Sequence, residues 1–332
     1  MKKFLGMMVL VGATMLTGCG SDNDDFVFTG PDTIAGAPAP IPTPDPTPDP
    51  VPVVNGFFVD AATGNDATGS FEGGLPFLTL QGATAAAPPG SDIIVRPGNY
   101  SDVVELEDGD RLLGSGSALA TNPDATVRPV LQGPIVLADG NTADFVRVDG
   151  SFGDAIDGNG QNGGTVTNCE LINSGDDGIG LSPFSGDWTI ENNLIDTTGP
   201  TGVGIPADTL GTTIATIRIN DNIIQNCTLN AMGFVISESS QLNAQITGNT
   251  MTGNQTGFTF EVIGGQTSIS CFDIEGNTND DTYIVSGVST STATINVEEF
   301  TNLVAVNNNS GTTSTGGGSI PPTSVADGTC GF

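Results

Sequence analysis

The sequence predicts an all-β chain that winds into a single-stranded, right-handed parallel β-helix, a solenoid with a short capping helix at its N-terminal end. Three observations favour this fold class. The composition is rich in turn and strand formers, with 47 glycines and with Val and Ile prominent among the 37% of hydrophobic residues. Short apolar segments recur at a nearly constant spacing. One alanine-rich segment precedes these repeats.

Asparagines mark the repeat. Four of them end segments that begin with isoleucine, and they follow one another at spacings of 29, 27 and 28 residues: Asn193, Asn222, Asn249 and Asn277. Short strands at such a period fit the coils of a β-helix, which stack ~4.8 Å apart. The four amides are therefore predicted to form an inward ladder of hydrogen bonds. Cys169 occupies the same position one coil earlier.

A second set of short strands begins at glycines that lie in phase with the asparagines. These glycines are Gly178, Gly202, Gly233 and Gly257. Setting Gly178 opposite Gly202 aligns Asp176 and Asp177 with the turn that contains Pro200. The alignment therefore predicts that these two aspartates lie in a turn.

The beginning of the body has a different pattern. Residues 57–60 predict a strand, residues 76–87 a short alanine-rich helix, and residues 93–100 a strand that runs into a turn. This order resembles the N-terminal segment of many pectin-lyase-like β-helix proteins. The resemblance implies that the helix covers the open end of the solenoid, where strand edges and apolar core would otherwise meet water. The solenoid is predicted to span residues 54–310, followed by a Ser/Thr/Gly-rich tail over residues 311–332.

Residues 1–18 are predicted to be a signal peptide, in which Lys2 and Lys3 precede an apolar run too short to span a bilayer comfortably. The run ends at Cys19 in the sequence Leu-Thr-Gly-Cys, which resembles the bacterial lipoprotein signal. That resemblance implies cleavage before Cys19 and acylation of the cysteine, by palmitate among other chains, which would anchor the protein in a membrane. The alternative is an ordinary signal peptide with a chance cysteine.

The residues after the cysteine predict where the anchored protein resides. Gly20 stands where inner-membrane lipoproteins of the resembled class have Asp, so the outer membrane or the cell surface is the expected location. Residues 19–53 form an acidic, proline-rich tether. The alternating prolines of residues 38–52 favour polyproline II, a semi-rigid spacer of ~3 Å per residue. A docking motif for a proline-recognising partner is the alternative.

The charge balance is strongly acidic: 38 Asp and Glu outnumber 7 Lys and Arg, there is no histidine, and the formal net charge is −31. Such a chain is not expected to bind nucleic acid, because neutralising phosphates requires Lys and Arg. It attracts cations, and calcium is the one cofactor that the sequence suggests. The turn that contains Asp154 and Asp157 is one candidate, although the sequence has no EF-hand or nonapeptide calcium repeat.

Four cysteines remain besides Cys19. Cys169 and Cys227 lie two coils apart, roughly 9.6 Å by the coil spacing, which is beyond the reach of a disulfide. Both are therefore predicted to be buried thiols that pack as small core residues. Cys271 begins one of the last coils and Cys330 lies near the chain's end. A Cys271–Cys330 disulfide is predicted to fasten the tail.

The segment Asn173–Ile179 contains the adjacent pair Asp176 and Asp177. It resembles the Asp-Asp motif of polygalacturonases, in which paired carboxylates supply acid and base to a glycosidic bond. Arg218 begins an Arg-Ile-Asn sequence roughly where that family has Arg-Ile-Lys. The family's lysine, its Gly-His-Gly motif and its Asn-Thr-Asp motif are missing from this chain. The alternative is a non-catalytic turn that leads into a strand.

A pectate-lyase-like elimination is the second catalytic hypothesis. It requires an unprotonated base, usually Arg or Lys, and calcium to neutralise the uronate. Arg218, the only arginine amid the repeating coils, is the candidate base. The candidate calcium ligands are Asp196, Asp208 and Asp221. A surface arginine in a salt bridge is the alternative for Arg218.

Fold alone does not decide function, since β-helices serve lyases, hydrolases, phage tailspikes and adhesins. The sequence favours a cell-surface lipoprotein whose β-helix body is non-catalytic and mediates adhesion, glycan binding or envelope interaction. The alternative is a polysaccharide lyase or glycoside hydrolase that acts on acidic polysaccharide. The expected partners are the membrane, through the lipid anchor, and polysaccharide.

Overall fold

The structure is a computed structural model that describes residues 56–71, 75–120, 126–196, 198–263, 268–280, 283–288, 293–309, 313–315 and 322–332. The chain divides into two units, residues 1–49 and residues 50–332. The predicted signal peptide, Cys19 and the tether lie outside the described residues. The second unit contains the solenoid.

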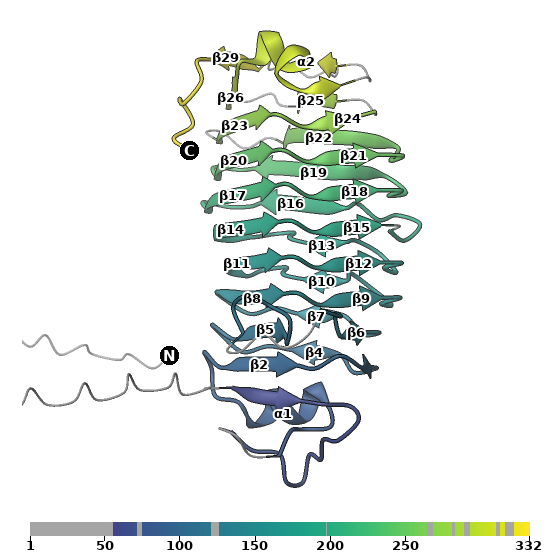
Figure 1. Ribbon diagram of the computed structural model, residues 1–332. Coiled ribbons are helices and arrows are strands. Elements are labelled where there is room, and N and C mark those ends of the chain that lie inside the picture. Colours follow the sequence, from purple (N-terminus) through teal and green to yellow (C-terminus); the bar gives the residue numbers. More distant parts are fainter. Residues whose placement is uncertain are drawn as a thin grey trace, which may run out of the picture. The chain divides into compact units, whose positions relative to one another are not determined.

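Parallel strands stack into four sheets along the solenoid (Figure 1). Sheet A has 11 strands: β1 (Phe57–Val59), β2 (Asp92–Val95), β5 (Arg111–Gly114), β8 (Asn141–Asp144), β11 (Asn162–Thr167), β14 (Ser185–Glu191), β17 (Ile214–Asn220), β20 (Gln241–Thr247), β23 (Ile269–Glu275), β26 (Thr294–Glu298) and β29 (Thr323–Val325). Sheet B has nine: β3 (Asn99–Tyr100), β6 (Val130–Leu131), β9 (Arg147–Asp149), β12 (Glu170–Ile172), β15 (Leu194–Asp196), β18 (Ile223–Gln225), β21 (Thr250–Thr252), β24 (Thr278–Asn279) and β27 (Asn308–Asn309).

The two shorter sheets form the third face. Sheet C has four strands: β4 (Val104–Glu105), β7 (Ile135–Val136), β10 (Ile156–Asp157) and β13 (Ile179–Gly180). Sheet D has five: β16 (Ile205–Thr209), β19 (Asn230–Ser237), β22 (Thr256–Ile263), β25 (Tyr283–Val288) and β28 (Thr313–Thr315). A bridge between Leu181 and Ala207 joins the two sheets, so they are continuous.

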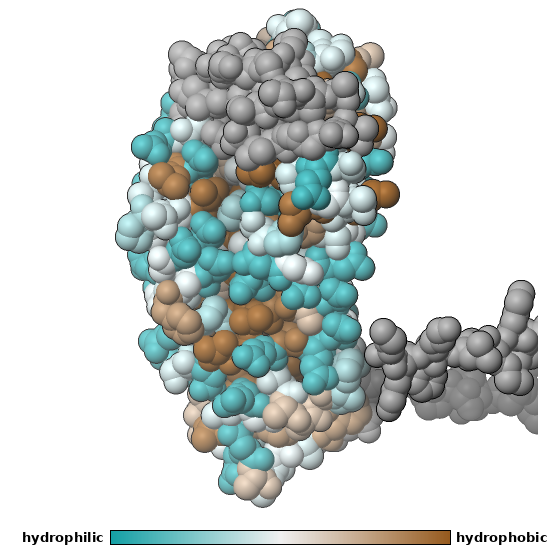
Figure 2. All heavy atoms as spheres, turned by 180° about the vertical axis from the view of Figure 1, so that it is seen from behind, coloured by the Kyte–Doolittle hydropathy of each residue, from teal (hydrophilic) through white to brown (hydrophobic). Residues whose placement is uncertain are grey.

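The chain passes from sheet A to sheet B and then to sheet C or D in coil after coil. Each strand pairs in parallel with the strand one coil away; Ile190 on β14, for example, lies between Val166 on β11 and Ile219 on β17. The predicted all-β parallel solenoid is therefore confirmed. Sheets C and D face away from the viewer in Figure 1, and Figure 2 shows that side of the molecule.

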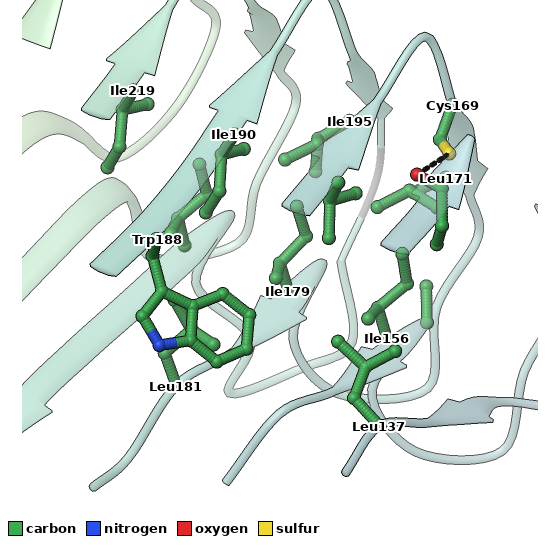
Figure 3. Close-up of a cluster of buried hydrophobic side chains, with 14 of the residues drawn as sticks. Leu137, Ile156, Cys169, Leu171, Ile179, Leu181, Trp188, Ile190, Ile195 and Ile219 are labelled. Atoms are coloured by element: carbon green, nitrogen blue, oxygen red, sulfur yellow. Dashed lines mark hydrogen bonds between the residues drawn. The ribbon is translucent and has the colours of Figure 1, made fainter. Parts of the chain in front are cut away.

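Alternation along the strands builds the core. In β17, Ala215, Ile217 and Ile219 are buried while the residues between them lie on the outer surface. Figure 3 shows side chains from all three faces meeting in the interior around Trp188, which is fully buried. Gly164 makes room for this indole, because a Cβ there would lie 2.7 Å from the ring.

The predicted asparagine ladder lies at the turns from sheet A to sheet B. The main-chain N–H and the side-chain Nδ2 of Asn222 both donate to Oδ1 of Asn249, each at 3.0 Å. The same Nδ2 also donates to the carbonyl of Ile190 at 2.9 Å. Asn193 donates in the same way to Asn222, and Asn249 to Asn277. Each amide therefore satisfies backbone groups of neighbouring coils inside the solenoid.

The ladder is longer than the four asparagines. The N–H of Cys169 donates to Oδ1 of Asn193 at 2.8 Å, so Cys169 does take the position one coil earlier. Asn307 continues the ladder beyond Asn277, with bonds of 3.0 and 2.9 Å. The sequence pattern missed Asn307 because a short helix, α2 (Leu303–Val306), precedes it instead of a strand.

A residue in the left-handed region precedes each ladder position from Cys169 to Asn277. These residues and their φ angles are Asn168 (53°), Asn192 (57°), Asp221 (56°), Gly248 (69°) and Gly276 (66°). Gly and Asn enter this region with the least strain, and Asp is also tolerated. The turn from sheet A to sheet B therefore keeps one geometry in successive coils.

The N-terminal end carries the predicted helix in shortened form, as α1 (Leu80–Ala86). Thr79 caps it, since its hydroxyl accepts the N–H of Gly82 at 3.0 Å. Leu80 and Ala83 are buried in the main core, as is Phe57 of the first strand. In the described part of the chain, no helix has the length and apolar character needed to cross a bilayer.

The sheets continue past residue 310, where the sequence placed the end of the solenoid. β28 pairs with β25, and β29 pairs with β26. The described parts of the Ser/Thr/Gly-rich tail therefore add strands to sheets A and D. A short 3₁₀-helix, η1 (Phe300–Asn302), leads into α2 before these last strands.

The predicted pairing of Gly178 with Gly202 proves to be two residues out of register. Ile179 lies opposite Gly204 and Ile205, not opposite Val203, because its N–H donates to the carbonyl of Gly204 and Leu181 pairs with Ala207. A two-residue slip keeps the inward and outward alternation, so hydrophobic patterning alone could not reveal it.

Candidate functional site

Three carboxylates meet at the turns that lead from sheet B into sheet C. Asp154 lies two residues before β10, and Asp176 and Asp177 lie just before β13 of the next coil. Because Ile156 pairs with Ile179, Asp177 stacks directly on Asp154. One ligand oxygen from each of the three carboxylates lies within 4.8 Å of the others. We call Asp154, Asp176 and Asp177 the carboxylate cluster.

A missing side chain allows Asp154 to take its position. A Cβ on Gly180 would lie 2.2 Å from Oδ2 of Asp154. The Asp154 carboxylate therefore occupies the space that any larger residue at 180 would fill. Asn159 donates from Nδ2 to the same oxygen at 3.4 Å.

Two of the three carboxylates are acceptors for the backbone of the next coil. The N–H of Asp177 donates to Oδ1 of Asp154 at 3.1 Å, and the N–H of Val203 donates to Oδ1 of Asp177 at 2.6 Å. Asp176 is exposed and accepts from the hydroxyl of Thr201 at 3.1 Å. Asp154 and Asp177 thus tie three coils together, and Asp176 is the member most open to solvent.

Asp154 and Asp177 of the cluster hold their protons more tightly than ordinary carboxylates. Burial, and secondarily the charges of Asp154, Asp176 and Asp208, raise the pKa of Asp177 to about 6, against the opposing N–H of Val203. Burial also raises the pKa of Asp154, with further contributions from Asp157 and Asp176. The charged residues that perturb these two groups are all acidic. A cation at the cluster would relieve this repulsion.

Arginines lie elsewhere in the structure. Four of the five form ion pairs on sheets A and B or beside them: Arg96 with Asp60, Arg111 with Asp92, Arg128 with Glu170, and Arg147 with Asp149 and Glu170. Arg218 makes no ion pair with any residue that the structure describes. Its guanidinium lies 5.5 Å from the ring centre of Phe332 on the outer side of sheet A. The structure therefore does not bring Arg218 together with Asp176 and Asp177.

The three candidate calcium ligands are also dispersed. Asp196 ends β15 of sheet B, Asp208 lies on β16 of sheet D, and Asp221 occupies the turn from sheet A to sheet B. Asp196 accepts from Gln225 and Asn226 at 2.9 and 2.8 Å. These aspartates do not converge on one point; among the described residues, the carboxylate cluster is the group that does.

Asp208 has a role similar to that of Asp154 and Asp177. It accepts the N–H of Val235 at 3.1 Å and the hydroxyl of Ser182. Burial raises its pKa, while these two donors lower it. Its charge is also one of those that raise the pKa of Asp177, so the acidic character of the third face extends beyond the cluster.

Phe152 is the residue beside the cluster that the sequence did not single out. Its side chain is 78% exposed, two residues before Asp154. An exposed ring beside hydrogen-bonding carboxylates is suited to stacking on an apolar face of a ligand. The local sequence Ser-Phe-Gly resembles any glycine-rich turn, so it carries no signal for exposure.

The cysteines are arranged as the sequence suggested. Cys271 and Cys330 form a disulfide with an S–S distance of 2.07 Å. Cys169 and Cys227 remain buried thiols. Burial raises the pKa of the Cys169 thiol to about 12, which keeps it protonated and unreactive.

The family comparison agrees with this geometry. The model of the right-handed β-helix region matches residues 114–279, half of the chain. The protein therefore belongs to the right-handed β-helix family. No curated protein and no solved structure matches the chain significantly.

Proposed function

We propose that this protein is an exported, lipid-anchored β-helix protein of the outer membrane or cell surface that binds a glycan or envelope ligand without cleaving it. The N-terminal sequence supports the location, because the apolar run and the Leu-Thr-Gly-Cys box at Cys19 resemble a lipoprotein signal. The carboxylate cluster and the exposed Phe152 ring beside it are the proposed binding surface, with calcium as its cation.

The non-catalytic assignment depends on one observation: the candidate acids are already used as hydrogen-bond acceptors for the protein backbone. Asp154 and Asp177 each accept a backbone N–H from the next coil. The candidate base Arg218 lies on sheet A, where its guanidinium stacks on the ring of Phe332. Lyase chemistry requires an arginine or lysine at the carboxylates and their bound uronate, and hydrolysis requires two carboxylates on opposite sides of the bond. All three carboxylates of the cluster instead lie in one stack of neighbouring turns.

A glycoside hydrolase is the second candidate, and one observation favours it. The pKa of Asp177 is raised to about 6, which is the range of a general acid near neutral pH. The arrangement argues against it, since the two carboxylates that accompany Asp177, those of Asp154 and Asp176, lie in the same stack of turns rather than across a bound glycosidic bond.

Binding and cleavage can be separated in one experiment. The full-length protein is titrated with acidic and neutral polysaccharides, with calcium and with chelator, and the same samples are assayed for new reducing ends and unsaturated ends. The expected result is calcium-dependent binding of at least one polysaccharide, with neither type of new end.

Two variants locate the binding surface. Asp176→Asn changes the exposed member of the cluster and is expected to weaken binding by about tenfold. Asp187→Asn, an exposed aspartate on sheet A, is the matched control and is expected to bind normally. Equal binding by both variants, or polysaccharide cleavage by the wild type, would contradict the proposal.

The anchor is tested separately. Cys19→Ser is expected to move the protein from the membrane fraction to the soluble fraction and to abolish incorporation of labelled palmitate. Wild-type and variant fractions that look alike would reject the lipoprotein assignment while leaving the binding surface untouched.

A further inference from the structure

The last residues of the chain fold back over sheet A. After β29, residues 326–332 turn so that Cys330 bonds to Cys271 on β23, and the ring of Phe332 reaches Arg218 on β17. Sheet A has the order β17, β20, β23, β26 and β29 here, so the segment spans four strand spacings, roughly 19 Å. Figure 1 shows the yellow C-terminal segment descending beside them. We call residues 326–332 the C-terminal strap.

The strap buries part of the outer surface of sheet A. Cys271 and Asp273 point outward from β23, yet each is only 8% exposed. Their register partners on β20, Asn243 and Gln245, are exposed and half-buried respectively. Sheet packing alone leaves outward residues accessible, so the strap is what covers this row.

Two kinds of bond hold the strap in place. The disulfide links it to β23. Glu298, which is 5% exposed at the end of β26, accepts the N–H of Gly328 at 2.9 Å and that of Cys330 at 2.5 Å. Only the first of these is covalent and removable without changing the sequence.

Carboxylate repulsion opposes the closed strap. A cavity of about 110 Å³ beneath it is lined by five carboxyl groups, with Ile274 and Val306: Asp273 and Glu275 of β23, Glu298 of β26, Glu299 after it, and Asp327 of the strap. Burial, and then the charges of Glu298 and Asp327, raise the pKa of Asp273. The charge of Asp273, followed by burial, raises the pKa of Glu275.

The other groups near Asp273 do not neutralise this charge. Gln245 of β20 donates to Asp273 at 3.2 Å but is neutral, and Val306 of α2 is apolar. Arg218 on β17 contacts the strap through the Phe332 ring rather than through a carboxylate. The closed strap therefore brings Asp327 into an uncompensated acidic pocket.

We propose that the C-terminal strap is a latch: the Cys271–Cys330 disulfide holds it closed against carboxylate repulsion, and reduction by a dithiol opens it at neutral pH. In that step the dithiol supplies two electrons and two protons, the S–S bond breaks, Cys271 and Cys330 become thiols, and the dithiol becomes a disulfide. Opening uncovers Arg218 and the outer row of β23. The latch does not depend on the binding role proposed for the carboxylate cluster.

The latch is also sensitive to pH once the disulfide is broken. Asp327 of the strap is one of the charges that raise the pKa of Asp273, after burial, and of Glu275, after Asp273 and burial, so closing the strap adds to both shifts. Closure is therefore favoured as the pH falls below these raised pKa values and disfavoured as the pH rises through them. The reduced strap is expected to be open near neutral pH and closed in mild acid.

Hydrogen exchange of the full-length chain tests the latch. Residues 322–332 are compared in the oxidised protein, in the protein reduced with dithiothreitol and in the Cys271→Ser/Cys330→Ser variant, with rates corrected for intrinsic exchange. At about pH 7.5, both forms without the disulfide are expected to exchange at least about tenfold faster than the oxidised form. At about pH 4.5 they are expected to return to within about threefold of it.

A third variant tests whether carboxylate repulsion by Asp327 opens the strap. Asp327→Asn in the double-serine background is expected to restore protection at about pH 7.5, whereas Asp187→Asn in the same background is not. Unchanged protection without the disulfide would show that the disulfide is not a latch. Exchange that stays fast in mild acid and in the Asp327→Asn variant would show that repulsion does not open the strap. Faster exchange in β14 as well would show general loosening and would also overturn the proposal.

Discussion

The turn from sheet A to sheet B and the turn from sheet B to sheet C both stack polar side chains from coil to coil, with opposite chemistry. The first uses neutral amides, such as Asn222, that are fully buried and that donate and accept in successive coils from Asn193 onward. The second uses the carboxylates Asp154 and Asp177, which accept but cannot donate and which repel each other. An amide carries both a donor and an acceptor, so each one can bond to the next along the ladder. Ionised carboxylates only accept, so stacking them requires protons or cations between them.

Breaking the amide ladder has the largest expected effect. Asn222→Ala removes the acceptor of two donors from Asn193 and leaves buried polar groups unpaired. The free energy of unfolding is expected to fall by about 3 kcal/mol or more, measured by guanidinium titration. The control Asn243→Ala changes an exposed asparagine on β20 and is expected to cost less than about 0.5 kcal/mol. Similar losses in the two variants would contradict the ladder's role.

Cations distinguish the two stacks of turns, because the carboxylate stack attracts them and the neutral amide ladder does not. Calcium at about 100 times its dissociation constant is expected to stabilise the protein by about 2.7 kcal/mol, seen as a rise in Tm. Asp176→Asn is expected to reduce this rise, while Asn243→Ala leaves it unchanged. A rise that is the same in wild type and in Asp176→Asn would place the calcium elsewhere.

Neutralising one carboxylate has a smaller effect that depends on pH. The pKa of Asp177 is raised to about 6 in the folded protein, so its protonated form contributes stability at low pH that is lost as the pH rises through about 6. Asp177→Asn keeps an acceptor for Val203 and should be more stable than wild type above that pH, by about 1 kcal/mol after discounting for solvent screening. Unfolding titrations from mild acid to neutral pH measure this; a constant difference across the range would contradict it.

Removing Arg218 has the smallest expected effect on both stacks. Its side chain is half-buried, makes no ion pair with the described residues and stacks on Phe332. Arg218→Ala should change the free energy of unfolding by about 0.5 kcal/mol or less and leave ligand binding at the carboxylate cluster unchanged. Loss of binding in this variant would show that Arg218 on sheet A contributes to the ligand site.

The sequence predicted the ladder better than the site. Asn193, Asn222, Asn249 and Asn277 share a turn geometry, so a constant spacing reveals them. Asp154 and Asp177 lie 23 residues apart, because their coil is shorter than the 27–29-residue period of the later coils. A search at the longer period therefore separated two carboxylates whose oxygens lie within 4.8 Å of each other.

Chain spacing also misplaced the other candidates. Asp196, Asp208 and Asp221 are close in sequence, but one coil carries them onto different sheets and a turn. Arg218 lies on sheet A, whereas Asp177 precedes sheet C. The partner of Arg218, Phe332, lies 114 residues away and arrives only because the disulfide directs the last residues across the sheet. Pairing at that distance follows from the completed fold, not from local pattern.

The carboxylate cluster is proposed to bind polysaccharide without cleaving it. The most direct measurement is the chain-length distribution of a bound polysaccharide after long incubation with the protein in molar excess, with calcium present. A distribution identical to that of the polysaccharide alone is expected. Shorter chains that appear with wild type and disappear with Asp176→Asn would show that the cluster belongs to a hydrolase or lyase site.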